Sequence, residues 1–441
     1  MKRGTYSTVA VVQILLLAIV SPTARAEDAP GGYVTRQEYE ELKAEMLALK
    51  KELASMKKET HAAAGEEKAD DKAVADLHKQ VLEPVTEEPV VAEQKEPPIG
   101  TTNFHIAGFG VGTFEDRQGS VSNFSATFNP IFLWELSPRL LYEGRLELEL
   151  SGSGTNLELE YSLLTYLVND YITLGAGEFL TPSNVFVERF EPLWINKLPD
   201  RPLAVYDGIL GERAIGAEVR GGFPIGPTRA NYSFYVSNGP NLNVFDPARA
   251  GTLDFNNFTD NNDNKAVGGR VGFLPFPGVE IGYGFEVSNP GAQGSSFADV
   301  GAFLQTVDLN ITRGSDLLKG RFDIHAQYVW SKVDSAVYDP TGVFGFGPLE
   351  FESKRDGGYA QIAYRPTQAG LDFLRDFEFI FRWDHLSRAP SGLGVGEEQR
   401  WTLGIDYWIT PGVVLKTAYQ WDQRSGEPNA NAFFIQTAAG F

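Results

Sequence analysis

The stretch RLLYEGRLELELS at residues 139–151 decides the fold, because apolar and charged side chains alternate along it. In a β-strand such residues lie on opposite faces. The apolar face holds Leu140, Tyr142, Leu146, Leu148 and Leu150, and the other face holds Glu143, Arg145, Glu147 and Glu149. Burying four charges in a soluble core would be very costly, so we expect the charged face to meet water.

The same alternation recurs from residue 104 to the end of the chain. In three further segments the apolar residues take one face and the polar residues take the other. The first segment has Leu157, Leu159, Tyr161 and Leu163 against Glu158, Glu160 and Ser162, and the second has Phe322, Ile324, Tyr328 and Trp330 against Arg321, Asp323, His325 and Gln327. The third has Phe379, Phe381 and Trp383 against Glu378, Arg382 and Asp384. Apolar faces this uniform suit lipid, and the polar faces suit an aqueous lumen. Counting these segments predicts an all-β transmembrane barrel of about 16 antiparallel strands over residues 102–441.

The spacing of turn residues supports a barrel independently. Short turn-like connections alternate with connections that are mostly longer and polar, as in outer-membrane barrels, where short turns face the periplasm. The short connections lie at 137–138, 169–170, 224–227, 275–278, 312–315, 366–370 and 411–412.

The first hundred residues have a different composition. We predict a signal peptide over residues 1–26, because Lys2 and Arg3 are followed by an apolar run and then by a small-residue site at 24–26. Residues 27–82 are rich in Glu, Lys and Ala, and a heptad seam predicts a periplasmic α-helical coiled coil, with a single solvated helix as the alternative. The seam consists of Tyr39, Leu42, Met46, Leu49, Leu53 and Met56. Residues 83–101 are rich in Pro and Glu, which predicts an extended linker.

Composition excludes several function classes. The chain has no cysteine, which rules out thiolate catalysis and cysteine-ligated metals. With 38 Lys and Arg against 58 Asp and Glu, nucleic acid is not an expected partner. We find no metal, phosphate-loop or nucleophile-elbow motif, so we expect no cofactor, no metal and no enzyme activity. A membrane hydrolase built around His385 is the enzymatic alternative.

The longest connection covers residues 181–213, TPSNVFVERFEPLWINKLPDRPLAVYDGILGER, and is the third long loop of the predicted barrel. A loop of this length is usually functional or disordered, and its many apolar residues argue against disorder. In this layout the mature chain resembles the trimeric porins of Gram-negative outer membranes. More narrowly, it resembles the phosphate-selective porin family, many of whose members begin with a coiled coil.

The resemblance implies that the third loop folds into the lumen and narrows it. Loop carboxylates would then face arginines on the barrel wall and create a field that sorts solutes by charge. The candidate loop residues are Glu188, Arg189, Glu191, Lys197, Asp200, Arg201 and Asp207, and the candidate wall residues are Arg145, Arg220, Arg270, Arg321, Arg382, Arg400, Glu143, Glu147, Glu158 and Glu160. Any one of them could instead be a solvated lumen residue or part of a structural ion pair.

Selectivity for phosphate needs a ladder of cations with little competing negative charge, and the sequence departs from that pattern. Most inward-facing charges are carboxylates. We therefore expect an outer-membrane porin that passes small hydrophilic solutes and ions by diffusion, general or mildly cation-preferring. The alternatives are an anion or phosphate channel, and a barrel anchor that tethers the outer membrane to the cell wall through the coiled coil.

The remaining expectations concern assembly and partners. Phe441 ends the last predicted strand and resembles the terminal aromatic signal by which barrels are recognised for assembly. Several tryptophans, Trp408 among them, are candidates for the aromatic girdles at the membrane interfaces. The expected partners are outer-membrane lipid, lipopolysaccharide and two further copies of the chain in a homotrimer.

Overall fold

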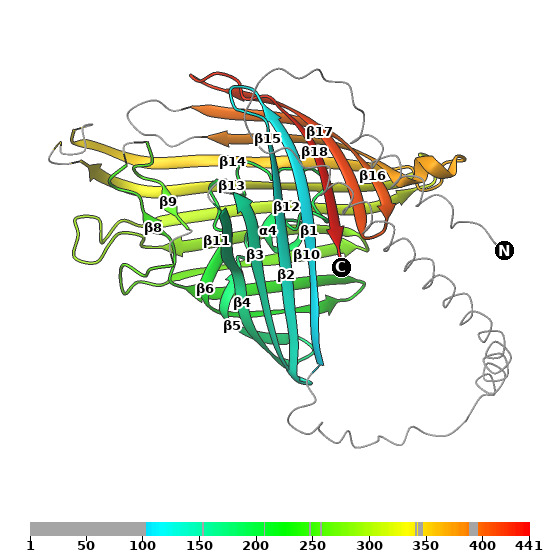
Figure 1. The fold of residues 1–441 in the computed structure, drawn as a ribbon. Coiled ribbons are helices and arrows are strands. Elements are labelled where there is room, and N and C mark those ends of the chain that lie inside the picture. Colours follow the sequence, from blue (N-terminus) through cyan, green and yellow to red (C-terminus); the bar gives the residue numbers. More distant parts are fainter. Residues whose placement is uncertain are drawn as a thin grey trace, which may run out of the picture. The chain divides into compact units, whose positions relative to one another are not determined.

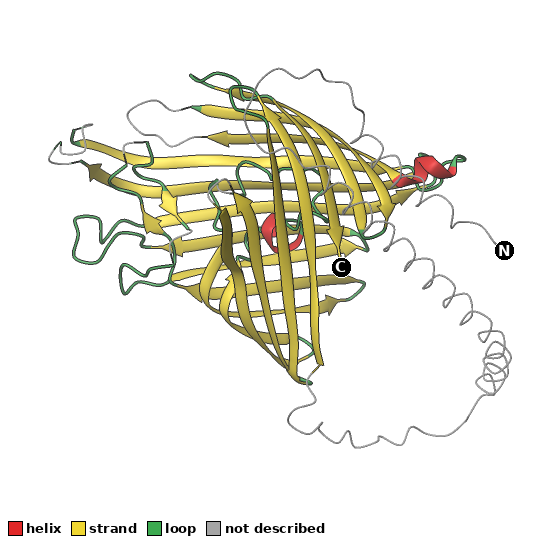
Figure 2. Cartoon of the chain, in the orientation of Figure 1, coloured by secondary structure: helices red, strands yellow, loops and turns green. Residues whose placement is uncertain are grey.

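The computed structural model describes residues 103–151, 154–206, 208–246, 248–255, 258–339, 342, 347–387 and 396–441. These residues form a closed barrel of sixteen antiparallel strands (Figures 1 and 2). The predicted all-β barrel is therefore confirmed. The predicted signal peptide, coiled coil and linker lie outside the described residues.

The barrel strands follow one another around the ring in chain order, and β8 and β9 form a separate two-stranded sheet. The elements are β1 Asn103–Arg117, β2 Asn123–Ser137, β3 Leu140–Ser151, β4 Gly154–Asn169, β5 Ile172–Leu180, α4 Val185–Arg189, β6 Arg213–Ile225, β7 Thr228–Ser237, β8 Asn241–Leu242, β9 Leu253–Asp254, β10 Ala266–Phe276, β11 Val279–Ser288, β12 Ala302–Ser315, β13 Gly320–Tyr338, β14 Leu349–Arg365, the 3-10 helix η1 Asp372–Asp376, β15 Phe377–Ser387, β16 Glu397–Thr410, β17 Val413–Arg424 and β18 Ala432–Gly440.

The ring closes where β1 pairs with β18, from Phe109 opposite Gly440 to Arg117 opposite Ala432. Among the described residues, closure leaves the barrel sheet without a free edge, which is the requirement for β-structure in hydrocarbon. No helix among the described residues is both long enough and apolar enough to span a bilayer.

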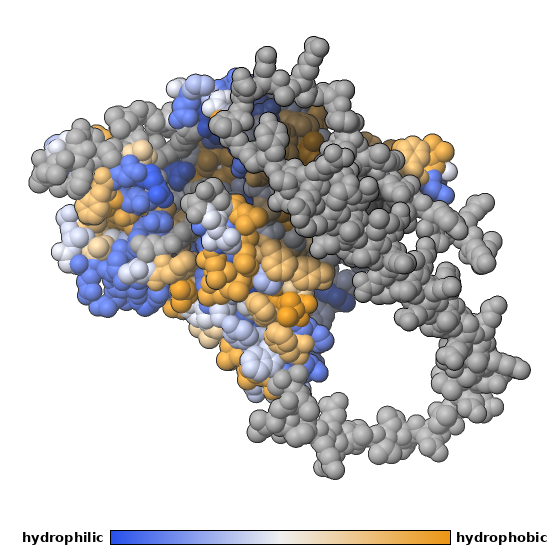
Figure 3. Space-filling view, in the orientation of Figure 1, coloured by the Kyte–Doolittle hydropathy of each residue, from blue (hydrophilic) through white to orange (hydrophobic). Residues whose placement is uncertain are grey.

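The outer face of the wall is apolar. Leu403 and Ile405 on β16 are 51% and 47% exposed, and Trp421 on β17 is 41% exposed. Figure 3 shows apolar residues over much of the visible wall and hydrophilic residues over the long connections at the left. This distribution matches the predicted lipid-facing side.

Two connections differ from the predicted turns. Residues 312–315, expected to form a turn, belong to β12, and Ser315 still pairs with Gly320 on β13. Their Gly and Ser suggested a break, but the hairpin pairing continues through them. The connection that begins at residue 366 is longer than expected, because η1 lies within it.

A β-bulge corrects the predicted facing of β4. Arg145 pairs with Tyr161, whereas the next residue, Leu146, pairs with Leu159, so Glu160 is the extra residue. An extra residue reverses the alternation beyond it. Tyr161 therefore points inward, where its hydroxyl donates to Glu143 at 3.0 Å, and the prediction that it faces lipid is wrong.

Candidate functional site

The connection between β5 and β6, residues 181–212, is called loop 3 below. Figure 2 shows its helix α4 within the ring of strands. Asn184 caps α4 by accepting from Val187 N at 3.3 Å, a position where Asn is favoured. The same side chain donates to Val205 O at 2.6 Å and to Gly211 O at 3.2 Å. Asn184 thus joins the beginning of loop 3 to its end.

Asp200 joins loop 3 to three strands of the wall. Its two oxygens lie 2.7 Å from Arg382 Nη2 on β15 and 2.9 Å from Arg400 Nη1 on β16, and Gln420 on β17 donates to it. Arg382 also contacts Asp384 at 2.8 Å, and Arg400 contacts Asp422 at 2.9 Å. These six residues are called the Asp200 cluster.

The Asp200 cluster is buried although it is charged. Arg382, Asp384 and Asp422 have 0% exposure. Such burial is tolerable only when each charge has an opposite partner and hydrogen bonds. Burial alone would raise the pKa of Asp200, but the positive charges of Arg382 and Arg400 outweigh it and hold this pKa below its ordinary value.

A second ionic attachment centres on Glu191 of loop 3. Glu191 lies 2.8 Å from Arg145 on β3 and pairs with Arg201 of the loop itself. Arg145 also contacts Glu160 at 3.0 Å. Burial opposes ionisation of Glu191, yet Arg201 and Arg145 lower its pKa. Arg145 is only 2% exposed, so the expectation that it meets water is wrong, because loop 3 covers it.

A third attachment lies on β6 and β11. Glu188 pairs with Arg220, and Arg189 Nη1 lies 2.8 Å from Glu280 Oε2. Glu280 in turn contacts Arg270 on β10 at 2.9 Å. Arg270 forms no ion pair with the described residues of loop 3; its second carboxylate partner is Asp308, at 2.7 Å.

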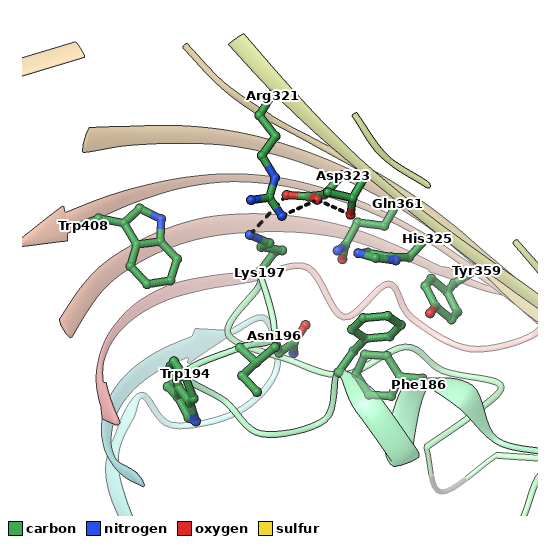
Figure 4. Close-up of a pocket in the computed structure, with 13 residues that line it drawn as sticks. Phe186, Trp194, Asn196, Lys197, Arg321, Asp323, His325, Tyr359, Gln361 and Trp408 are labelled. Atoms are coloured by element: carbon green, nitrogen blue, oxygen red, sulfur yellow. Dashed lines mark hydrogen bonds and ion pairs between the residues drawn. The ribbon is translucent and has the colours of Figure 1, made fainter. Parts of the chain in front are cut away.

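Lys197 provides a fourth attachment. Its Nζ lies 2.8 Å from Glu378 Oε1 on β15. It also lies 3.7 Å from Asp323 Oδ2 on β13, and Arg321 Nη2 lies 3.3 Å from Asp323 Oδ1 (Figure 4). Trp408 donates from Nε1 to Glu378 at 3.1 Å. Trp408 therefore faces inward, and its predicted place in a girdle is wrong: it shares the even-numbered side of β16 with Asp406.

Backbone carbonyls of loop 3 are also held by the wall. Lys416, with 0% exposure, donates to the carbonyls of Leu193 and Asn196. Gln436 donates to Pro199 O at 3.1 Å, and Gln327 donates to Ser183 O at 2.7 Å. These bonds satisfy loop carbonyls that would otherwise be buried without partners.

Apolar contacts complete the attachment. Phe186 and Val205 of loop 3 pack in one cluster with Val329 and Tyr359 of the wall. Leu198 packs with Ile380 and Phe434, and Leu193 packs with Phe109 and Val414. Gly404 leaves room for Leu198, since a Cβ there would collide with the leucine side chain. The inner face is thus partly apolar where loop 3 covers it.

A cavity of about 380 Å³ remains between loop 3 and strands β12, β13, β14 and β16. A second cavity of about 400 Å³ lies beside it. The two cavities share four lining residues: Lys197, Arg321, Asp323 and Trp408. Figure 4 shows Phe186 and Trp194 across the first cavity from Arg321 and Gln361.

The predicted residues fall into three groups. Most of them take part in the ion pairs of loop 3. The loop residues are Glu188, Arg189, Glu191, Lys197, Asp200 and Arg201, and the predicted wall residues are Arg145, Arg220, Arg382 and Arg400. Six predicted wall residues make no ion pair with loop 3 within the described part of the chain: Arg270, Arg321, Glu143, Glu147, Glu158 and Glu160. Glu158 pairs with Arg213 instead. Asp207 lies outside the described residues.

Sequence reasoning missed several residues that hold loop 3. Two of them are Lys416 and Gln420 on β17, which alternate with Thr417, Tyr419 and Trp421. The two-residue period could therefore have placed them on the inner face. Asn184 carried no comparable signal, because a capping residue is recognisable only once α4 is known. Loop carboxylates and wall arginines also make direct contacts rather than facing each other across an open lumen.

Phe441 lies at the closure of the barrel. It exchanges backbone hydrogen bonds with Gly108, at 3.1 Å and 3.0 Å, and its ring stacks on Phe128 with 5.7 Å between centroids. The ring is 60% exposed on the outer side. Its role as an assembly signal stays a prediction.

No family model and no curated protein matches the chain. Among solved structures, it is similar to the outer membrane channel DcaP of Acinetobacter baumannii, with a TM-score of 0.50 and 12% identity, covering 77% of this chain and 97% of that one. It is also similar to an anion-selective porin from Comamonas acidovorans, with a TM-score of 0.49 and 11% identity over 77% and 100% of the two chains.

A further similar structure is the trimer form of OmpT, an outer membrane protein of Vibrio cholerae, with a TM-score of 0.47 and 12% identity over 77% and 99% of the chains. At such identities a likeness shows the fold alone. The chain has a closed sixteen-strand barrel fold similar to that of the outer membrane channel DcaP.

Proposed function

We propose that the protein is an outer-membrane porin through which small hydrophilic solutes and ions diffuse passively, with loop 3 narrowing the passage. The observation that carries the proposal is the attachment of loop 3 to inward-facing side chains of β3, β6, β15, β16 and β17. A sixteen-strand barrel without such a segment would enclose a wide aqueous channel. A loop fixed across that space leaves a smaller passage.

The charges of the passage favour cations mildly. Each wall arginine described above contacts at least one carboxylate, so its positive charge is locally neutralised. The luminal carboxylate of Glu143 is instead held by a neutral hydroxyl, since Tyr161 donates to it at 3.0 Å. Negative charge therefore exceeds positive charge along the passage, and cations are attracted into it.

Planar-bilayer recording of the purified protein tests both parts of the proposal. We expect stepwise conductance in potassium chloride and a small reversal potential of the sign that marks cation preference in a salt gradient. The chain lacking residues 27–100 should conduct similarly, because the barrel makes the passage. A barrel that inserts without conducting would refute the porin, and a strong anion preference would refute the selectivity.

The proposal places the barrel in the outer membrane, in contact with lipid and lipopolysaccharide, and residues 27–82 in the periplasm as a coiled coil. A homotrimer is part of the proposal, because a heptad seam can bundle copies of the chain. Chemical cross-linking in native membranes should give bands up to three chains and none larger.

A further inference from the structure

The cavity beside loop 3 has the lining of a binding site rather than of a plain water path. Five phenylalanine, tryptophan and tyrosine side chains line it: Phe186, Phe190, Trp194, Tyr359 and Trp408. Its volume of about 380 Å³ suits a small organic molecule. Aromatic walls of this kind stack well on a flat ring.

The charges at its edge compensate one another. Lys197 contacts Glu378 and Asp323 at 2.8 Å and 3.7 Å, and Arg321 contacts Asp323 at 3.3 Å. A charged solute would have to displace one of these partners, which leaves the other charge unpaired. The cavity therefore favours an uncharged solute.

One polar side chain in the lining has no partner for its oxygen. Gln361 on β14 is 6% exposed, and its Oε1 accepts no hydrogen bond from the residues that the structure describes. Figure 4 shows its carboxamide beside His325, on the side of the cavity opposite Phe186. A carboxamide presents a donor next to an acceptor, and it pairs in two-point fashion with a ring edge that carries the same two groups.

From this combination we propose that the cavity binds a flat, uncharged heteroaromatic ring with a hydrogen-bond donor beside an acceptor, the chemistry of a nucleobase or nucleoside. A sugar or other polyol fits less well. Its many hydroxyls need several partners, whereas Lys197, Arg321 and Asp323 are already engaged in ion pairs and hydroxyls buried without partners are costly. This inference names a solute for the proposed channel and so rests on the proposed function.

Equilibrium dialysis of the full chain in detergent with labelled uridine tests the inference. We expect saturable binding by the native protein and binding weaker by about tenfold in Gln361→Leu, where the edge pairing is lost. The matched control is Gln305→Leu. Gln305 lies on the outer face of β12, where it accepts from Tyr283 at 3.2 Å, so this variant should bind as the native protein does.

A ligand control works without mutation and so does not depend on the variant's folding. The compound 3-methyluridine keeps the ring and its neutrality but lacks the donor on the ring edge, and we expect it to bind as weakly as uridine binds to Gln361→Leu. Equal binding of both nucleosides, equal binding of ribose, or no binding of uridine would overturn the inference. Bilayer conductance, measured in parallel, separates the two proposals: conductance without uridine binding refutes only the binding site, and binding without conductance refutes only the porin.

Discussion

The two faces of β16 carry opposite side chains in opposite surroundings. On the outer face Leu403 and Ile405 are about half exposed, whereas on the inner face Thr402 and Asp406 are almost fully buried. A soluble protein would show the reverse. In the proposed porin, lipid covers the outer face. On the inner face of β16, Arg400 can be charged because Asp200 of loop 3 pairs with it at 2.9 Å. The same wall thus packs against loop 3 on its inner face and, in the proposed porin, against lipid on its outer face.

The largest expected effect comes from removing the partner of two inner-face arginines. Asp200→Ala leaves Arg382 and Arg400 without their shared carboxylate, which should weaken the attachment of loop 3 by about 3–5 kcal/mol. Protease cleavage within loop 3 and a larger single-channel conductance would report the release. The control is Asp260→Asn, which breaks only the external pair with Lys265. Unchanged cleavage and conductance in Asp200→Ala would contradict the assigned attachment.

On the outer face, adding a charge rather than removing one should destabilise the barrel. Leu403→Arg places a charge in the lipid-facing band and should reduce barrel stability by about 2–4 kcal/mol. The measurement is urea unfolding of the barrel reconstituted in lipid vesicles. Leu403→Phe keeps the surface apolar and should change stability little. If both variants unfolded alike, the assignment of this face to lipid would be wrong.

A smaller effect is expected from filling space on the inner face. In Gly404→Ala the added methyl group collides with Leu198, and overpacking of this kind should cost about 1–3 kcal/mol. Gly314→Ala is the matched control, because a Cβ there meets no atom within 4 Å. Stability and conductance should shift in the first variant and stay unchanged in the second. Equal behaviour would mean that Leu198 does not pack on this wall.

The smallest effect is expected from pH. Because the folded pKa values of Asp200 and Glu191 lie below their ordinary values, the stabilisation from both groups is complete above the unfolded carboxyl pKa of roughly 4. It is lost only as pH falls through the lower folded values. The attachment of loop 3, measured as protease cleavage within the loop, should therefore stay constant from about pH 7 to 5 and weaken below about 4. A transition between pH 5 and 7 would point to other groups.

The sequence predicted the wall of this barrel well because a strand alternates locally. The facing of Arg382 and Asp384 follows from their neighbours Phe381 and Trp383 alone. The reversal at Glu160 could not be predicted, because a bulge depends on how β3 and β4 pair.

The candidate site was harder to predict than the wall. The charged residues of loop 3 were identified, but which arginine meets which carboxylate depends on the path of the loop through space. Nothing in the sequence near Asp200 indicates that it meets Arg382 and Arg400, about two hundred residues away along the chain. Charge and spacing identify such candidates, and only the folded loop pairs them.

The most direct test of the central claim, that loop 3 is fixed against the inner face, uses the absence of native cysteine. Leu198→Cys combined with Gly404→Cys should form a disulfide on mild oxidation, detected as a mobility shift in a denaturing, non-reducing gel. Leu198→Cys combined with Ile405→Cys should form none, since moving one residue along β16 transfers the thiol to the outer face. Absence of the first disulfide, or equal formation of both, would contradict the claim.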